Sequence, residues 1–549
     1  MAEEKNLFQI IKGSLGLVIL ALAFIASTIS VIYNHITTEG PDVKAIRICH
    51  WQLEKGFRNA LQAIIDDYEK DYKARTGKTV RVIQVPVAEK GYAQFINTGL
   101  IGNMAPDIIE VGHTKAFENF SNIVRYFLPL GKYVNEPNPY NAGTKLAGVP
   151  WKDTFFDDLQ GNITPELQEY YRIPFSVFTS RIYYNKKLLK EISGSDKFPT
   201  TYLGFTKLCD KVKEYNEEHH TNIIPVAASK YQLAFFEGNY GKAFTADMIR
   251  RLDDNFNMIL EPQEAYVKYL DKQWNFDSPE FQNVVKSTSE ITKYFMPGWI
   301  AANRDDAAFA FVQGRALMTS SGSWDAKSLI DQSKGLFGVG IAMLPFPTDH
   351  PEYGKYVKGG VNEASVTGGI PWGVNKASNK IDICIDFLRY ATTRAANQKF
   401  NDLVYWIPVI KGSEPGHDFL KKFAPIQEGY SATNKIPIST QYTIIVGGYR
   451  WLLYAGKMTP EQYTAGRISV YEKTGEDGFL KLQEKDYRVL RSYESVITSD
   501  LIMEAYGNKQ QKADARTRLD SVTLIAARKN YLYYKYNDQL KKSSEKEAE

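Results

Sequence analysis

The stretch AIRICHWQLEKGFRNALQAIIDDYEKDYKARTGKTVRVIQVPV, residues 45–87, decides the fold of this chain. Its first part, residues 45–51, is mostly apolar and predicts a strand. Apolar side chains then recur at helical spacing over residues 57–77, and Gly77 ends the pattern as a C-cap. Residues 78–87 predict a second strand. A strand, a helix and a strand in this order form a βαβ unit, so we expect a parallel sheet.

A third predicted strand, residues 107–112, follows after the short loop NMAP. In open parallel sheets, ligands bind just outside the carboxyl ends of the strands. The loops that begin near Trp51 and near His113 both leave such ends. They are therefore candidate binding loops.

Two later stretches indicate that the chain passes between two lobes. Residues 170–191 contain the extended run RIPFSVFTSRIYYN, which is longer than one compact sheet requires. Residues 366–378 form a second extended stretch, followed by a predicted helix. The residues between these two stretches have a mixed α/β pattern. A chain that leaves a first lobe and returns predicts a hinged architecture.

Length and charge narrow the class of protein. The chain has 549 residues and a formal net charge of +4, and at roughly 100–200 residues per domain its length predicts two to four units. The charge is too small for a nucleic-acid footprint, and no Lys/Arg block resembles a backbone-binding arm. Cys49, Cys209 and Cys384 are far apart and have no zinc spacing. We favour unpaired cysteines, with one disulfide as the alternative.

The N-terminal region predicts export. Residues 14–33 contain no charged side chain and are about long enough to cross a bilayer. Lys5 and Lys12 precede this run, which favours a cytoplasmic tail and an exported remainder. A cleaved signal peptide is the alternative to an uncleaved anchor. No cysteine follows closely enough for a lipid anchor.

The C-terminal region has a helical pattern of its own. The sequence TGEDGF, residues 474–479, is expected to break the chain. Apolar residues repeat at seven-residue spacing up to Met503, and a second apolar series begins after Gly507. Two helices that pack as a hairpin or pair with a partner fit this pattern. The tail at residues 541–549 is expected to be disordered.

One tryptophan stands in an unusual context. In ALMTSSGSWDA, residues 316–326, a short apolar run gives way to small polar residues and then to Trp324. A loop offers a large aromatic face little to pack against. Trp324 is therefore either a core residue near a hinge or a surface on which a ligand stacks.

Taken together, these segments resemble the extracellular solute-binding proteins of ABC importers, the group that includes maltose-binding protein. The likeness is carried by CHWQLEKGF, APDIIEVGHTKAF, RIPFSVFTSRIYYNKKLL, GRALMTSSGSWDAKSLID and GGIPWGVNKASNKIDICIDFLRYATTRAANQ, in this order. It spans residues 44–475. The resemblance implies two α/β lobes of the type II binding-protein fold that close on a ligand by hinge bending.

The resemblance also implies a division of the chain. We expect residues 1–43 to hold a cytoplasmic stub, a transmembrane or signal-anchor helix and a linker. Lobe one is expected at residues 44–175, lobe two at 184–365, a return to lobe one at 366–475, and a helical extension with a disordered tail at 476–549.

The implied ligand contacts come from matching positions. Residues Trp51 to Lys55 match the first ligand loop of lobe one, with Gln52, Glu54 and Lys55 as polar contacts. Residues Gly112 to Thr114 match the second loop, with His113 and Thr114. Tyr231 matches a stacking aromatic of lobe two, and Trp324 matches the best-known stacking position. Tyr442 lies near another aromatic contact of lobe one.

Sugar chemistry agrees with such a set of residues. A pyranose has an apolar C–H face that stacks on an aromatic ring and a hydroxyl rim that needs hydrogen-bond partners. Such sites are mostly apolar with a few aimed polar groups. Phe178 stands where maltose-binding protein has a carboxylate, which puts maltodextrin specificity in doubt. The implied ligand is a mono- or oligosaccharide, and the implied partner is a membrane permease.

Other readings compete with this one. The aromatic residues are also ordinary core candidates, and we expect Trp372 and Trp406 to pack or to form the hinge wall. His219 and His220 lie in a polar turn, and no metal or cofactor is expected. No GxSxG, HExxH, P-loop or complete GxGxxG occurs, so no enzyme is expected. A membrane-anchored sensing ectodomain and a binder of polyols or peptides remain alternatives.

Overall fold

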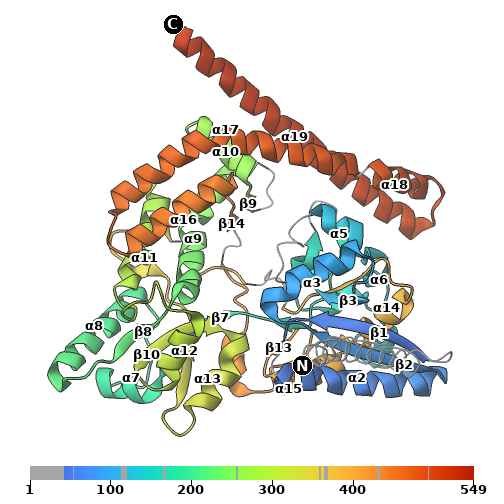
Figure 1. Ribbon diagram of the computed structural model, residues 1–549, viewed down its shortest axis with the longest axis horizontal. Coiled ribbons are helices and arrows are strands. Elements are labelled where there is room, and N and C mark those ends of the chain that lie inside the picture. The colour runs from blue at the N-terminus through green and yellow to red at the C-terminus, as the bar shows by residue number, and fades with distance from the viewer. Residues whose placement is uncertain are drawn as a thin grey trace, which may run out of the picture.

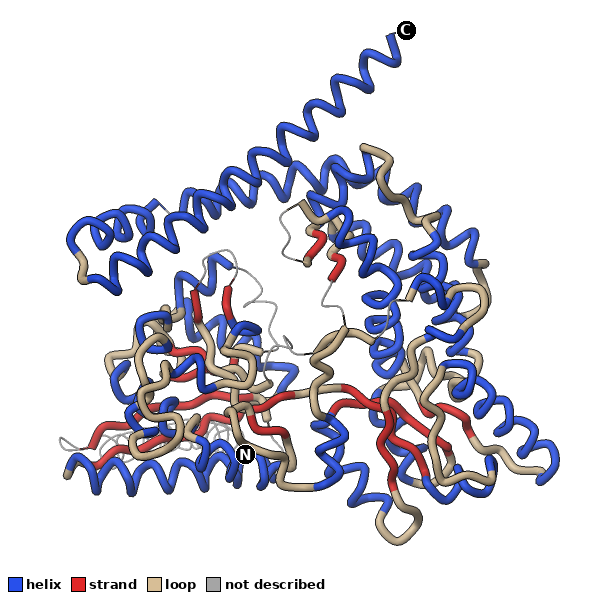
Figure 2. The backbone as a smooth tube through the Cα atoms, turned by 180° about the vertical axis from the view of Figure 1, so that it is seen from behind, coloured by secondary structure: helices blue, strands red, loops and turns tan. Residues whose placement is uncertain are grey.

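The computed structural model describes residues 43–52, 55–112, 120–164, 169–254, 258–357, 360–363, 369–429, 433–492 and 494–548. The predicted anchor at residues 14–33 lies outside these ranges. Within them, no helix combines the length and apolar character needed to span a bilayer. Two separate sheets, red in Figure 2, mark two lobes.

Lobe one is built on the predicted βαβ unit. Strand β1 (Val43–His50) pairs in parallel with β2 (Thr79–Pro86) and with β3 (Ile108–Glu110), while β12 (Trp372–Val374) joins β3 antiparallel. Helices α2 (Lys55–Thr76) and α15 (Arg394–Val404) cover one face, and α3 (Glu89–Ile101) and α5 (Phe120–Tyr126) cover the other (Figure 1). The predicted parallel sheet is confirmed.

The alternation of side chains along β1 explains this two-faced arrangement. Ile46 and Ile48 are fully buried in the core that contains α2, whereas Cys49 packs with Tyr92 and Ile96 of α3. Successive strand residues point to opposite faces, so one short strand contributes to both cores. Cys49, Cys209 and Cys384 are all buried and form no disulfide.

Lobe two has its own four-stranded sheet in the order β11-β7-β10-β8. Its strands are β7 (Ser180–Asn185), β8 (Ile224–Ala227), β10 (Ala316–Gly322) and β11 (Val339–Ala342). Its helices are α7 (Lys186–Ser193), α8 (Tyr202–His219), α9 (Lys230–Leu252), α10 (Pro262–Leu270), α11 (Pro279–Thr292), α12 (Arg304–Val312) and α13 (Ala326–Ser333).

Shorter elements complete the two lobes. They are α6 (Gly131–Val134), α14 (Ile381–Ala391), β4 (Ile163–Thr164), β5 (Glu169–Tyr170), β6 (Ser176–Val177), β9 (Ile259–Leu260), β13 (Ile407–Pro408) and β14 (Thr433–Asn434). The 3-10 turns are η1 (Pro139–Asn141), η2 (Trp151–Thr154), η3 (Gln160–Asn162), η4 (Ser323–Asp325), η5 (Pro347–Asp349), η6 (Gly354–Tyr356) and η7 (Asp418–Phe423).

The crossovers are partly as expected. Strand β6 pairs with β13 in lobe one, and β7 begins lobe two at Ser180. Residues 369–408 return to lobe one through β12, α14, α15 and β13, and η7 then packs against β11 of lobe two. The expected return over 366–475 is wrong beyond that point, because β14 pairs with β9 of lobe two and α16 (Thr440–Tyr454) packs in the same core. An amphipathic helix fits either lobe by pattern alone, so only tertiary packing assigns it.

The extension is one long helix followed by a hairpin. Helix α17 (Pro460–Ser492) runs straight through TGEDGF, so the expected break there is wrong. Its Gly475 is needed for close packing, since a Cβ there would lie under 3.0 Å from two atoms of the Tyr266 ring. Helices α18 (Glu494–Tyr506) and α19 (Lys509–Ala548) turn back at Gly507, as expected. Helix α19 continues through most of the tail expected to be disordered.

Candidate functional site

A cavity of about 790 Å³ lies between the two lobes. Lobe one contributes the first turn of α2 and the C-terminal end of α15 through Phe57, Leu403 and Trp406. Lobe two contributes the start of α12 and the segment from η4 to α13, including Arg304 and Trp324. Both lobes therefore supply walls, as a hinge-closing site requires.

Trp324 both packs and lines this cavity. It is half-buried, and its ring stands edge-on to Phe178 at 5.4 Å between centroids. Phe178 also stands edge-on to Trp406 at 4.9 Å, so one aromatic series crosses from lobe two to lobe one. Gly322 makes room for the indole, because a Cβ there would fall well under 3.0 Å from three ring atoms. The indole therefore folds back over the end of β10.

Charged and polar groups surround the aromatic wall. The Arg304 guanidinium pairs with the Asp325 carboxylate, which also accepts a hydrogen bond from the Ser321 hydroxyl. Arg304 lies 5.3 Å above the centre of the Tyr231 ring. Asp305 and Asp306 open α12 and also line the cavity. This pattern of apolar rings beside fixed charges is typical of small-molecule sites.

Tyr231 lies beside this cluster. Ser229 caps α9 and accepts the backbone N–H of Tyr231 at 3.1 Å, which fixes the first turn. Phe235, one turn later, stands 5.2 Å from the Tyr231 ring and 6.3 Å from the Trp324 ring. Burial raises the pKa of the Tyr231 hydroxyl, so it stays neutral. The structure therefore brings Tyr231 and Trp324 together.

The first loop of lobe one is only partly described. Trp51 is half-buried and packs edge-on against Tyr92 at 5.2 Å, and Gln52 follows it at the carboxyl end of β1. Lys55 is the first residue of α2. Glu54, His113 and Thr114 lie outside the described residues. Trp51 and Gln52 are separate from the residues that line the 790 Å³ cavity.

Sequence reasoning missed a carboxyl group next to this loop. Glu110 ends β3 and is fully buried. Burial raises its pKa well above the usual range, and the Gln52 side chain and the Trp51 backbone oppose this shift to a lesser degree. The signal was present in DIIEVG, where an acidic residue follows a fully apolar strand start. Phe57, Arg304 and Asp325 were also missed, because nothing in their local pattern shows that they face another lobe.

Tyr442 does not belong to lobe one, and that expectation is wrong. It lies in the first turn of α16, is 3% exposed, and packs against Tyr471 at 5.4 Å within lobe two. It lines a second pocket of about 310 Å³ beside Arg467. Trp372 is fully buried, whereas Trp406 is 5% exposed and forms part of the interlobe wall.

Metal chemistry finds no support in the part of the chain that the structure describes. No group of three or more His, Cys, Asp or Glu side chains there is arranged to hold an ion. His219 and His220 are exposed at the end of α8.

The chain is similar to known sugar-binding proteins. It is 24% identical over 373 residues to the multiple sugar-binding protein of Streptococcus mutans serotype c, covering 65% of this chain and 74% of that one. Among solved structures, the sugar-binding protein MalE from the phytopathogen Xanthomonas citri has a TM-score of 0.55 at 14% identity, over 81% of this chain and 99% of that one.

A chitin oligosaccharide binding protein has a TM-score of 0.53 at 17% identity, over 79% of this chain and 99% of that one. At these sequence identities the solved structures show similarity of fold alone, and that fold agrees with the two lobes described above. The sequence profile of the bacterial extracellular solute-binding proteins matches residues 54–398, well over half of the chain. The chain therefore belongs to the bacterial extracellular solute-binding proteins.

Proposed function

We propose that this protein binds a mono- or oligosaccharide in the cavity between its lobes and releases it unchanged. The observation that carries this proposal is Trp324, a half-buried indole on the wall of a 790 Å³ interlobe cavity beside the Arg304–Asp325 pair. Ligand pockets are commonly about 300–1,000 Å³, so there is room for more than one sugar ring.

The chemistry of the walls suits a sugar. Phe57, Trp324 and Trp406 supply apolar surface for C–H faces, and Asp305 and Asp331 supply acceptors for hydroxyl groups. An analogue that lacks one hydroxyl group leaves the matching polar group of the site without a partner, and it therefore binds more weakly. The name of the Streptococcus mutans relative, a multiple sugar-binding protein, supports the same ligand class.

Beyond the residues that line the cavity, we propose further ligand contacts from Trp51, Gln52, Glu54, Lys55, His113 and Thr114 of lobe one and from Tyr231 of lobe two. We place the binding region outside the cytoplasmic membrane, held by an anchor at residues 14–33. The proposed partner is the membrane permease of an ABC importer. The family contains binding proteins, and no catalytic step is proposed.

A binding screen tests the proposal. Residues 44–549 are titrated with mono- and oligosaccharides, polyols and peptides, and binding is followed by thermal shift and calorimetry. A ligand at about a hundred times its Kd stabilises the folded state by about 2.7 kcal/mol. A sugar hit is expected, and Trp324→Ala should weaken it about tenfold, or about 1.4 kcal/mol.

Trp451→Ala is the matched control. Trp451 is also a half-buried tryptophan of lobe two, but it lies between the cations of Arg450 and Lys230 rather than on the cavity wall. It should leave sugar affinity unchanged. A hit confined to polyols or peptides would refute the ligand class, and a sugar hit that survives Trp324→Ala would refute the assigned site.

A further inference from the structure

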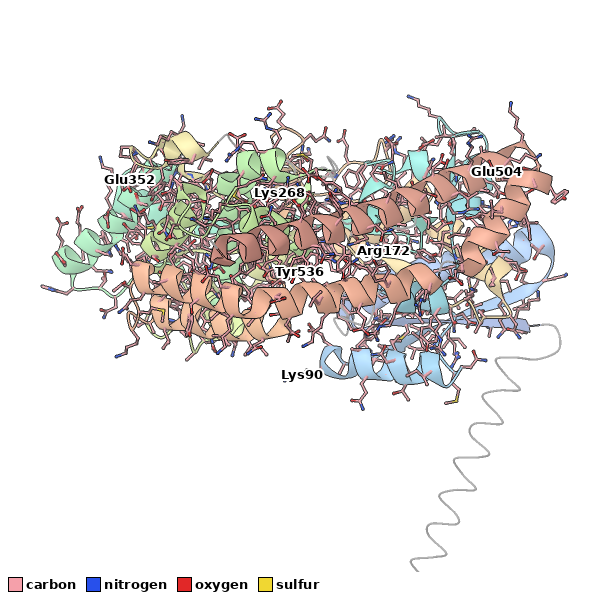
Figure 3. The ribbon with its side chains drawn as sticks, turned by 90° about the horizontal axis from the view of Figure 1, so that it is seen from above. Lys90, Arg172, Lys268, Glu352, Glu504 and Tyr536 are labelled. Carbon is pink, nitrogen blue, oxygen red and sulfur yellow. The ribbon has the colours of Figure 1, made fainter. Side chains whose placement is uncertain are left out.

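The C-terminal extension joins the two lobes. We call α17, α18 and α19, residues 460–548, the strap. Helix α17 leaves the core of lobe two and passes to α5 of lobe one, where α18 and the start of α19 follow. Helix α19 then returns to α10 of lobe two. Figure 3 looks down on this path, with Glu504 near the turn over lobe one and Tyr536 on the returning helix.

The strap is attached firmly to lobe two. Tyr536 is 2% exposed and packs against the Tyr266 ring of α10 at 6.3 Å between centroids. Arg528 forms an ion pair of 2.8 Å with Glu264, whose carboxylate is fully buried on α10. Lys529 adds an ion pair of 3.6 Å to Glu261, which caps α10. Buried aromatic packing and two ion pairs thus fix this foot.

The described attachment to lobe one is mostly aliphatic. Val522 is 4% exposed and joins the core cluster that contains Tyr92 and Tyr171, and Ile497 packs against the same cluster. The charge of Arg518 acts on Glu169 and lowers its pKa, against the larger opposite effect of burial. Arg518 itself is paired with Asp500 inside the strap at 2.6 Å. Among the described side chains, Val522 and Ile497 supply aliphatic contacts at this foot, and Arg518 adds a neighbouring charge.

The strap is stiff over the distance that it bridges. Val522 of the lobe-one foot and Leu532 of the lobe-two foot are ten residues apart on one continuous helix, or about 15 Å at 1.5 Å per residue. A helix does not shorten or stretch without breaking its backbone hydrogen bonds. The separation of the two feet is therefore fixed while both stay attached.

The position of the strap gives this rigidity a mechanical consequence. In Figures 1 and 2 the strap runs across the lobes on the side away from β13 and α15, where the chain crosses between the lobes. A rotation of one lobe about the crossovers changes the distance between points on the far side. The hinge therefore turns only if one foot yields, and the lobe-two foot is held by the buried Arg528–Glu264 ion pair.

We propose that the strap holds the lobes at a set angle and that ligand-driven hinge movement requires the lobe-one foot to release. The effect on ligand affinity rests on the proposed function, whereas the effect on the angle does not. Hinge movement breaks the contact between this foot and lobe one, so the free energy of that contact opposes ligand binding. Weakening that contact should therefore raise sugar affinity several-fold.

Distance measurements on the whole chain test this without a ligand. Spin labels at Lys73→Cys in lobe one and Lys197→Cys in lobe two report the lobe separation, and both positions are exposed. The native cysteines are buried and will not compete for label. The intact strap should give one narrow distance distribution, and Val522→Asp should broaden it at least twofold.

Leu524→Asp is the matched control, because Leu524 lies on the same helix but is 69% exposed. It should leave the distribution narrow. If Val522→Asp fails to fold, Val522→Ala and Ile497→Ala make the same test more mildly. The proposal is overturned if the intact chain already shows the broad distribution, or if folded foot variants stay as narrow as the control. A sugar screen without a hit would refute the proposed function but would not affect the measured distance distributions.

Discussion

A single methyl group at Gly322 should displace Trp324 from the interlobe wall. Gly322 has φ of −85° and ψ of 168°, which any residue adopts, so Gly322→Ala introduces no backbone strain. The added Cβ would instead lie under 3.0 Å from three atoms of the Trp324 ring. To regain van der Waals distance the ring must withdraw by at least about 1 Å.

The cost follows from what the ring gives up. Its edge-on contact with Phe178 is of a kind worth about 0.5–1.5 kcal/mol, and an off-rotamer side chain costs about 0.5–1.5 kcal/mol. Alanine also makes the unfolded chain less flexible than glycine does, which stabilises the folded state by about 0.4–1 kcal/mol. We expect a net destabilisation of about 1–2 kcal/mol and a loss of sugar affinity similar to that of Trp324→Ala.

Denaturant unfolding and ligand titration of residues 44–549 measure both effects. The matched control is Gly238→Ala, at an exposed position inside α9 where an added Cβ meets no atom within 4 Å. It should raise stability by about 0.5–1 kcal/mol and leave binding intact. Gly322→Ala with raised stability and unchanged affinity would refute the assigned position of the indole.

Two further predictions concern buried titratable groups. Burial lowers the pKa of His50 from 6.5 to about 4, so the unfolded chain takes up this proton first, and the free energy of unfolding should fall as pH drops from about 6.5 to about 4. His50→Gln should flatten this slope in urea unfolding series; an unchanged slope would contradict the assignment. Arg528→Ala leaves the buried Glu264 carboxylate without its ion-pair partner and should cost about 3 kcal/mol. The cost should be smaller at lower pH, because burial raises the pKa of the Glu264 carboxyl group. The exposed Arg516→Ala should cost under about 0.5 kcal/mol, and equal losses in the two variants would contradict the reasoning.

Local pattern was enough for the framework of lobe one. Residues 45–51 and 78–87 have strand patterns and residues 57–77 have helical spacing, which predicts a βαβ unit. Strand β1, helix α2 and strand β2 follow that prediction closely. The hinged second lobe followed from extended stretches too long for one sheet. The apolar series after Gly507 predicted a helix there, and α19 begins at Lys509.

Predictions from local sequence pattern were wrong where a residue packs against a residue distant in the chain. Gly475 looks like a helix breaker, yet its missing Cβ lets α17 pass close to Tyr266. Tyr442 looks like a cleft aromatic, yet it is core in lobe two.

The sequence alone determined the βαβ start of lobe one, the two-lobe class and the value of Trp324 as a candidate, because periodicity, turn residues and an aromatic in a polar loop are local properties. Only the tertiary structure decided that Phe57 and Arg304 face the same cavity. It also decided that the C-terminal helices bind both lobes. The physical reason is that packing between elements distant in the chain depends on shape and burial in three dimensions, to which no local spacing corresponds.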